Sequence, residues 1–90
     1  MAQIRIPTQL RSLTGGERLL KMGGGTVAEV LDNLESKYPG FKKRILDEDG
    51  QPTQFIGIYV AGDDVRFLDG MKTALEDDAE LSIVPASSGG

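Results

Sequence analysis

The last four residues of the chain, Ser87-Ser88-Gly89-Gly90, have the clearest chemical potential. Glycine has no Cβ, so another protein can approach the backbone of Gly89 and Gly90 closely. A terminal carboxylate has an ordinary pKa of about 3.5, is ionised at neutral pH and is a poor electrophile until a leaving group is attached. Such a tail could thread into a partner's active site, an interpretation that the rest of the chain favours over the one that the ending alone suggests. The alternative is a frayed end of small residues without a role.

Two missing residue types narrow the chemistry. The 90 residues include no cysteine and no histidine. The first absence excludes disulfides, thiolate metal sites and a cysteine nucleophile, and the second removes the commonest general base and metal ligand. The remaining polar residues form no recognisable catalytic constellation. We therefore predict a carrier or substrate protein rather than an enzyme, with no bound metal or cofactor.

Length and charge indicate the class of protein and exclude two kinds of partner. Ninety residues correspond to one domain. The net charge of −4 argues against nucleic-acid and anionic-membrane partners, which need a basic footprint. Residues 1–6 alternate apolar with polar and do not resemble a signal peptide, and no apolar run approaches the length of a membrane span. We predict a cytoplasmic protein.

Two strands and one long helix are expected in the first half of the chain. Ile4 and Ile6 alternate with polar residues and predict a strand, and a turn at Gly15-Gly16 leads into a second strand over 17–22. Apolar residues at helical spacing predict a helix over 27–38. Thr26 and Glu29 form a capping-box pattern, in which Glu29 is expected to accept from the Thr26 amide.

The second half of the chain predicts strands and turns. Residues 55–60 form the strongest strand pattern, and residues 65–68 are expected to be short and extended. In the last strand, Leu81 and Ile83 should point inward while Ser82 and Val84 point outward. A domain over 1–84 and a tail over 85–90 follow. The element order predicts an α+β fold, with a sheet covered on one face by one main helix.

At this level of detail the sequence resembles the ubiquitin-like sulfur carriers. That family includes the carrier for cysteine biosynthesis, to which the resemblance is greatest, the thiamine-pathway carrier and the small subunit of molybdopterin synthase. The matching stretches are Ile6-Pro7-Thr8, Leu10-Arg11, Thr14-Gly15-Gly16, Leu34-Glu35 with Tyr38, Ile58-Tyr59-Val60, Asp64-Val65-Arg66-Phe67, Pro85-Ala86 and Gly89-Gly90. The resemblance implies a β-grasp fold, with a mixed sheet whose first and last strands are neighbours.

The resemblance also implies a function for the tail. A ubiquitin-activating-type enzyme would use ATP to adenylate the Gly90 carboxylate, and a sulfur donor would convert it to a thiocarboxylate. Gly89, Ser88 and Ser87 would give access, although the family has a small apolar pair where this chain has the two serines. Because the chain has no cysteine, Gly90 is the evident attachment point for sulfur.

Several partners and alternatives remain open at this stage. The sulfur acceptor would be a biosynthetic enzyme, with a cysteine synthase-like enzyme first, and a metalloprotease that trims the tail or releases product is a further partner. The alternatives are a molybdopterin or thiamine sulfur carrier, a protein modifier conjugated to lysines, and a β-grasp interaction module whose diglycine has no role.

A docking face for these partners is expected on the outward side of the sheet. An apolar patch rimmed by charge would suit an activating enzyme. Five side chains are expected there: Tyr59, Val84, Phe55, Phe67 and Arg66. The alternatives are that Phe55 and Phe67 belong to the core, and that Arg66 pairs locally with Asp63 or Asp64.

Overall fold

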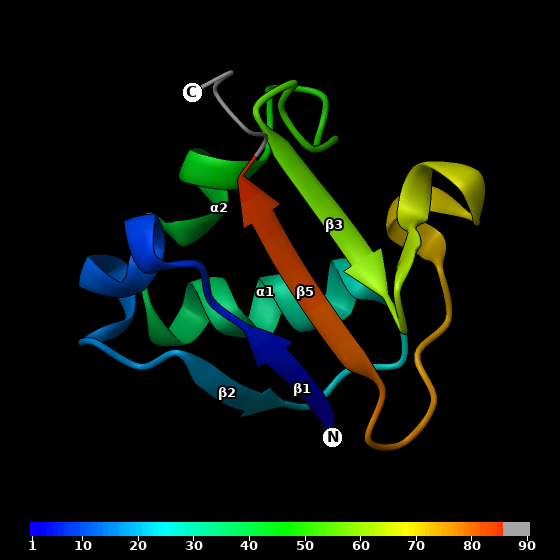
Figure 1. Cartoon of the computed structure of the whole chain (residues 1–90), viewed down its shortest axis with the longest axis horizontal. Helices are drawn as coiled ribbons and strands as arrows, with labels where there is room; N and C mark the ends of the chain where they lie inside the picture. The colour runs from blue at the N-terminus through cyan, green and yellow to red at the C-terminus, as the bar shows by residue number, and fades with distance from the viewer. Residues whose placement is uncertain (86–90) are drawn as a thin grey trace.

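A five-stranded sheet organises the computed structural model, which describes residues 1–85. Its strands are β1 (Ala2–Arg5), β2 (Leu19–Met22), β3 (Ile56–Val60), β4 (Asp63–Asp64) and β5 (Glu80–Pro85). They lie in the order β2-β1-β5-β3-β4. The β1–β5 pair is parallel and the other pairs are antiparallel, so the sheet is mixed. The predicted α+β class and the adjacency of the first and last strands are confirmed (Figure 1).

The helices lie on one side of this sheet and at its ends. The long helix α1 (Val27–Lys37) crosses behind the strands, and the short α2 (Phe41–Ile45) follows it (Figure 1). Three 3-10 segments connect strands: η1 (Thr8–Thr14), η2 (Val65–Phe67) and η3 (Gly70–Lys72). No helix within residues 1–85 is long and apolar enough to cross a membrane.

Alternation in the strands and helical spacing in α1 bring one set of apolar side chains together. On the sheet side, Ile4, Ile58 and Leu81 are fully buried. The apolar stripe of α1 packs on them, together with α2, through Val27, Val30, Leu31, Leu34 and Phe41. Because the helices cover only this face, the other face of the sheet stays available to solvent.

The start of α1 confirms the helix prediction and corrects one detail. Thr26 Oγ1 accepts a hydrogen bond from the Glu29 amide at 3.2 Å, as a helix N-cap does. The Glu29 carboxylate, however, accepts from the Gly25 amide at 2.9 Å and not from Thr26. Gly24 lies in this loop with φ +140°, where an added Cβ would sit 2.8 Å from the Val30 amide nitrogen. Glycine is therefore required for the loop to pack against the helix.

Residues 65–68 were expected to be extended, and that prediction is wrong. Residues 65–67 form the 3-10 turn η2, because Asp64 Oδ1 accepts from the Arg66 amide at 2.8 Å and caps the turn. The turn places Val65 in the core. It also directs the next side chains, Phe67 and Leu68, away from the core. Two strand boundaries differ slightly from expectation, since β2 begins at Leu19 and β3 at Ile56.

Candidate docking face and tail exit

The uncovered face of the sheet carries the side chains that alternate with the core residues. Leu20 of β2 and Ile83 of β5 point inward. Their neighbours Leu19 and Val84 therefore point outward, and they are 46% and 43% exposed. Large apolar side chains left this open on a sheet favour contact with another protein.

Tyr59 extends this apolar surface across β3. A Cβ added to Gly57 would lie 2.8 Å from Cε1 of Tyr59, so the tyrosine ring lies over the glycine. Gly57 is the register partner of Val84, and Tyr59 is the partner of Ser82. The ring therefore lies beside the position of Val84, and the two predicted face residues are brought together on neighbouring strands.

A groove runs along this face between β5 and the β1–β2 connection. Its lining includes Arg5, Arg11, Arg18, Leu19, Val84 and Pro85, and we name it the arginine groove. Arg5 Nε pairs with Glu80 Oε1 at 2.9 Å, and Arg11 Nε donates to the Ile6 carbonyl at 3.1 Å. These contacts hold two of the guanidinium groups in place. Among the residues that the structure describes, no acidic side chain lines the groove.

The predicted tail residues Ser87, Ser88, Gly89 and Gly90 lie outside the described residues. The structure does place the residue from which the tail continues. Pro85 ends β5, pairs in register with Ile56 and lines the arginine groove. The tail therefore leaves the domain at one end of the outward face.

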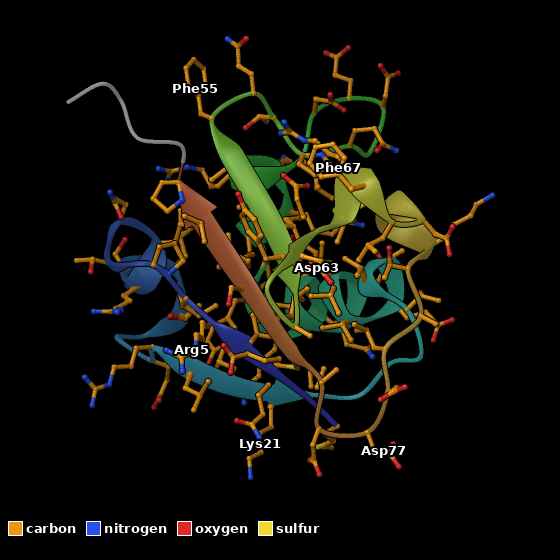
Figure 2. The ribbon with its side chains drawn as sticks, turned by 45° about the vertical axis from the view of Figure 1, so that its right-hand side comes forward. Arg5, Lys21, Phe55, Asp63, Phe67 and Asp77 are labelled. Carbon is orange, nitrogen blue, oxygen red and sulfur yellow. The ribbon has the colours of Figure 1, made fainter. Side chains whose placement is uncertain are left out.

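Phe55 lies at the same end of the sheet, and the alternative that it belongs to the core is wrong. It directly precedes β3, and its side chain is 66% exposed. The next residue, Ile56, pairs with Pro85. Phe55 is therefore near the tail exit, where Figure 2 shows it pointing outward at the start of β3.

Phe67 is exposed as well, but it lies elsewhere. Its side chain is 86% exposed on η2, so its assignment to the core is also wrong. It lines a different groove from Val84, one that it shares with Asp63 and Leu68. Figure 2 shows Phe67 and Asp63 on the far side of β3 from Arg5. Phe67 is therefore not part of the surface that surrounds the tail exit.

Arg66 has a structural contact that the sequence did not indicate. Its Nη2 donates to the Ile56 carbonyl at 3.1 Å, which ties η2 to the start of β3. Within residues 1–85 no ion pair joins Arg66 to Asp63 or Asp64, so the predicted local pair is wrong. The hydrogen bond between Arg66 and the Asp64 carboxylate comes from the Arg66 backbone amide.

Of the predicted face residues, only Val84 lines the arginine groove. The charged and exposed apolar residues of the groove that the sequence did not indicate include Arg5, Arg11, Arg18 and Leu19. For Leu19 a signal existed, because Leu20 and Met22 are spaced as inward residues of one strand. For the arginines no local signal exists. They come from β1, η1 and the segment before β2, and only the folded chain brings them together.

Comparison with known proteins identifies the family of this fold and face. The family model described as ThiS family matches residues 4–90. The chain belongs to the ThiS family. The sulfur carrier protein CysO of Mycobacterium tuberculosis is 39% identical over 89 residues, which are 97% of this chain and 96% of CysO.

Solved structures agree with this assignment. A chain in the crystal structure of the Amycolatopsis orientalis BexX/CysO complex has a TM-score of 0.94 and 40% identity, with 100% of both chains covered. The solution structure of small archaeal modifier protein 1 from Methanosarcina acetivorans has a TM-score of 0.82 and 33% identity, over 99% of this chain and 95% of that one. The predicted β-grasp fold and the resemblance to ubiquitin-like sulfur carriers are confirmed.

Proposed function

We propose that this ThiS-family chain is a sulfur carrier whose Gly90 carboxylate is activated and converted to a thiocarboxylate. The sulfur is then donated in biosynthesis, with cysteine as the product. The observation that carries this proposal is the 39% identity to the sulfur carrier CysO, which extends over 97% of the chain. The diglycine at 89–90 supplies the group that the chemistry needs.

The proposed chemistry has two steps, both catalysed by partners. A Gly90 carboxylate oxygen attacks the α-phosphorus of ATP, pyrophosphate leaves, and an acyl-adenylate forms. A hydrosulfide equivalent from a sulfur donor then attacks the carbonyl carbon, and AMP leaves with the electron pair of the broken C–O bond. The chain needs no catalytic group of its own for these steps, in keeping with its lack of cysteine and histidine.

The outward face is the proposed docking site for the activating enzyme. Leu19, Tyr59 and Val84 offer apolar area, and the arginine groove beside them offers positive charge. A partner bound here would have the tail exit at Pro85 inside its contact area. Five further residues can span at most about 17 Å when extended, which limits the distance from this face to the active site of the partner.

For the sulfur acceptor we propose a cysteine synthase-like enzyme, and a metalloprotease is the proposed partner for tail trimming or product release. The chain itself is proposed to have no enzymatic activity. A thiamine or molybdopterin carrier is chemically equivalent up to the thiocarboxylate, and only the acceptor differs. The acceptor can be tested by mixing the thiocarboxylated chain with a cysteine synthase-like enzyme and an O-activated serine, and detecting by mass spectrometry the cysteine adduct on Gly90. Addition of the metalloprotease should then hydrolyse that adduct and release free cysteine.

A second candidate function is protein modification through an isopeptide bond from Gly90 to lysines. The similarity to small archaeal modifier protein 1 favours it, with 33% identity and a TM-score of 0.82. Both functions share the acyl-adenylate, so they diverge only in the nucleophile that attacks it. Diglycine remnants on lysines of cellular proteins, found by mass spectrometry, would support modification.

The test of the leading proposal is intact-mass spectrometry. The full chain is incubated with ATP, a ubiquitin-activating-type enzyme and sulfide, and the expected product carries one sulfur in place of one oxygen. Fragmentation should locate the change at Gly90. The control is a chain lacking Gly89 and Gly90, which should acquire no sulfur. A chain that keeps its mass with every activating enzyme of this type would contradict the proposal.

A further inference from the structure

A second groove lies at the β4 edge of the sheet. It is bounded by β4, η2 and the segment that joins η3 to β5. Its apolar part includes Val60, Ala61, Phe67 and Leu68. We name it the acidic groove, for the charges described below. It shares no lining residue with the arginine groove. Figure 2 shows Asp63 and Phe67 beyond β3, while Arg5 and Lys21 lie on the opposite side of β5.

The apolar residues at the mouth of this groove are exposed for a structural reason. The capped turn η2 buries Val65 and forces Phe67 and Leu68 outward. Two consecutive large side chains are thus held in solvent, one of them almost fully. Since the fold gains nothing from an exposed phenyl ring, this pair favours burial against a partner.

Acidic side chains surround this apolar pair. Six of them line the groove: Asp63, Asp69, Glu76, Asp77, Asp78 and Glu80. No lysine or arginine within residues 1–85 lines it, and only Glu80 has an ion-pair partner there, which is Arg5. The nearby Arg66 guanidinium is engaged by the Ile56 carbonyl. The groove therefore combines an apolar contact area with five carboxylates that have no ion-pair partner within residues 1–85.

We propose that the acidic groove docks a basic segment of a partner protein. An apolar side chain of that segment packs on Phe67 and Leu68, while flanking lysines or arginines pair with the carboxylates. Charge complementarity and the exposed apolar pair together select this occupant. A metal ion is a poorer one, because residues 1–85 contain no cluster of acidic groups arranged to hold a metal.

The proposal does not depend on sulfur chemistry. Because the two grooves share no lining residue, a partner could hold the domain at the acidic groove while another protein occupies the outward face and the tail exit. The acidic groove would then keep the carrier bound to its partners between separate reactions at the tail.

The test uses the full chain, labelled with ¹⁵N, and a capped synthetic hexapeptide of sequence Lys-Leu-Lys-Arg-Leu-Lys. Saturable amide shifts are expected at Asp63, Phe67 and Leu68, with Leu19 and Val84 unchanged. A matching peptide with serine in place of leucine should bind at least about fivefold more weakly, because it lacks the apolar contact. No saturable binding of the leucine peptide, or equal binding of the serine peptide, would overturn the proposal.

Two variants locate the binding energy. The double change Asp77→Asn with Asp78→Asn should raise Kd about fivefold, since exposed ion pairs are individually weak. Asparagine also tolerates the positive φ of Asp78, so the loop should be preserved. Phe67→Ser should raise Kd by a similar factor in both low and high salt, and its exposed position makes a folding defect unexpected.

The matched control removes the same charge elsewhere. Glu48→Gln with Asp49→Asn lies in the exposed loop before β3 and should leave Kd unchanged. If this control weakens binding as much as the Asp77 and Asp78 pair does, the peptide senses only net charge. That result, or a Phe67→Ser variant that binds as the wild-type chain does, would overturn the proposal.

Discussion

The arginine groove and the acidic groove each combine exposed apolar side chains with charged side chains. The charges have opposite sign in the two grooves, and different secondary structure holds the side chains in place. In the arginine groove, Leu19 and Val84 are fixed by strand alternation, and two of the arginines are held by Glu80 and a carbonyl. In the acidic groove, Phe67 and most of the carboxylates come from 3-10 turns and loops. The net charge of −4 is therefore unevenly distributed, with positive side chains in one groove and negative side chains in the other.

The difference teaches how one small sheet can distinguish two partners. A partner with acidic and apolar residues fits the arginine groove, and one with basic and apolar residues fits the acidic groove. Opposite potentials also repel the wrong partner from each groove, which contributes to specificity and to association rate. The comparison predicts that changes in one groove leave binding at the other intact.

The largest effect is expected for Val84→Asp. The change places a carboxylate beside the Tyr59 ring on the outward face, next to the tail exit, where apolar contacts with a partner would be lost. We expect kcat/KM for activation to fall by about 100-fold, as measured by ATP–pyrophosphate exchange.

Val84→Thr is the matched control, because it keeps a β-branched side chain on the strand without adding charge. It should cost far less, and hexapeptide binding at the acidic groove should be unchanged in both variants. Loss of peptide binding in Val84→Asp would mean that the two surfaces are not independent.

A smaller effect is expected for Arg18→Glu, which reverses one charge in the arginine groove. Activation should require about tenfold more of the chain to reach half-maximal rate, because a favourable exposed charge contact becomes a repulsive one. The defect should shrink in high salt, where such interactions are screened.

Lys21→Glu provides the comparison for that variant. Lys21 is also an exposed cation of β2, but it does not line the groove. Its reversal changes net charge equally and should have a clearly weaker effect. Equal defects in Arg18→Glu and Lys21→Glu would contradict a specific role for the arginine groove. They would indicate that the activating enzyme responds to the total charge of the face.

The smallest effect concerns Glu35, a carboxylate in neither groove. It accepts hydrogen bonds from the Gly40 and Lys42 amides, both at 2.8 Å. These bonds, aided by the charges of Lys42 and Lys43, hold the pKa of the Glu35 carboxyl below its ordinary value. The carboxylates of the acidic groove receive no such hydrogen bond within residues 1–85.

Glu35→Gln should therefore change stability and leave both grooves functional. A lowered pKa in the folded state means that the stabilisation is complete above the ordinary pKa of glutamate and is lost as pH falls through the lowered value. The Tm of the variant should be slightly below wild type at neutral pH, with the difference shrinking in acid. Glu48→Gln is the control, because the Glu48 carboxylate accepts no hydrogen bond within residues 1–85, and its Tm should match that of wild type at neutral pH.

The sequence pattern was sufficient to predict the sheet, the long helix and part of the docking face, namely Tyr59 and Val84. Period-two alternation correctly predicted that Val84 and Tyr59 point outward, because a strand covered on one face leaves no other choice. The same reasoning wrongly predicted an extended segment at residues 65–68. There the Asp64 side chain accepts from the Arg66 amide and caps a 3-10 turn instead. That local hydrogen bond also decided the exposure of Phe67.

The grooves themselves could not be predicted. The arginine groove joins residues near positions 5, 11, 18 and 84, and the acidic groove joins β4 to the segment before β5. Both depend on side chains that meet only after the strands have paired. The Glu29 contact was misassigned by one residue, since its carboxylate accepts from the Gly25 amide and not from the Thr26 amide.

The parallel pairing of β1 with β5 has a consequence for the life of the chain before it meets any partner. The two strands at the heart of the sheet are separated by most of the sequence, so the sheet cannot close until β5 has been synthesised. Contacts of such sequence separation form late, and a nascent chain is translated from its N-terminus. A ribosome that stalls early therefore releases an unfolded fragment that proteases can remove. A partner that recognises the finished sheet thus engages only chains translated at least through β5.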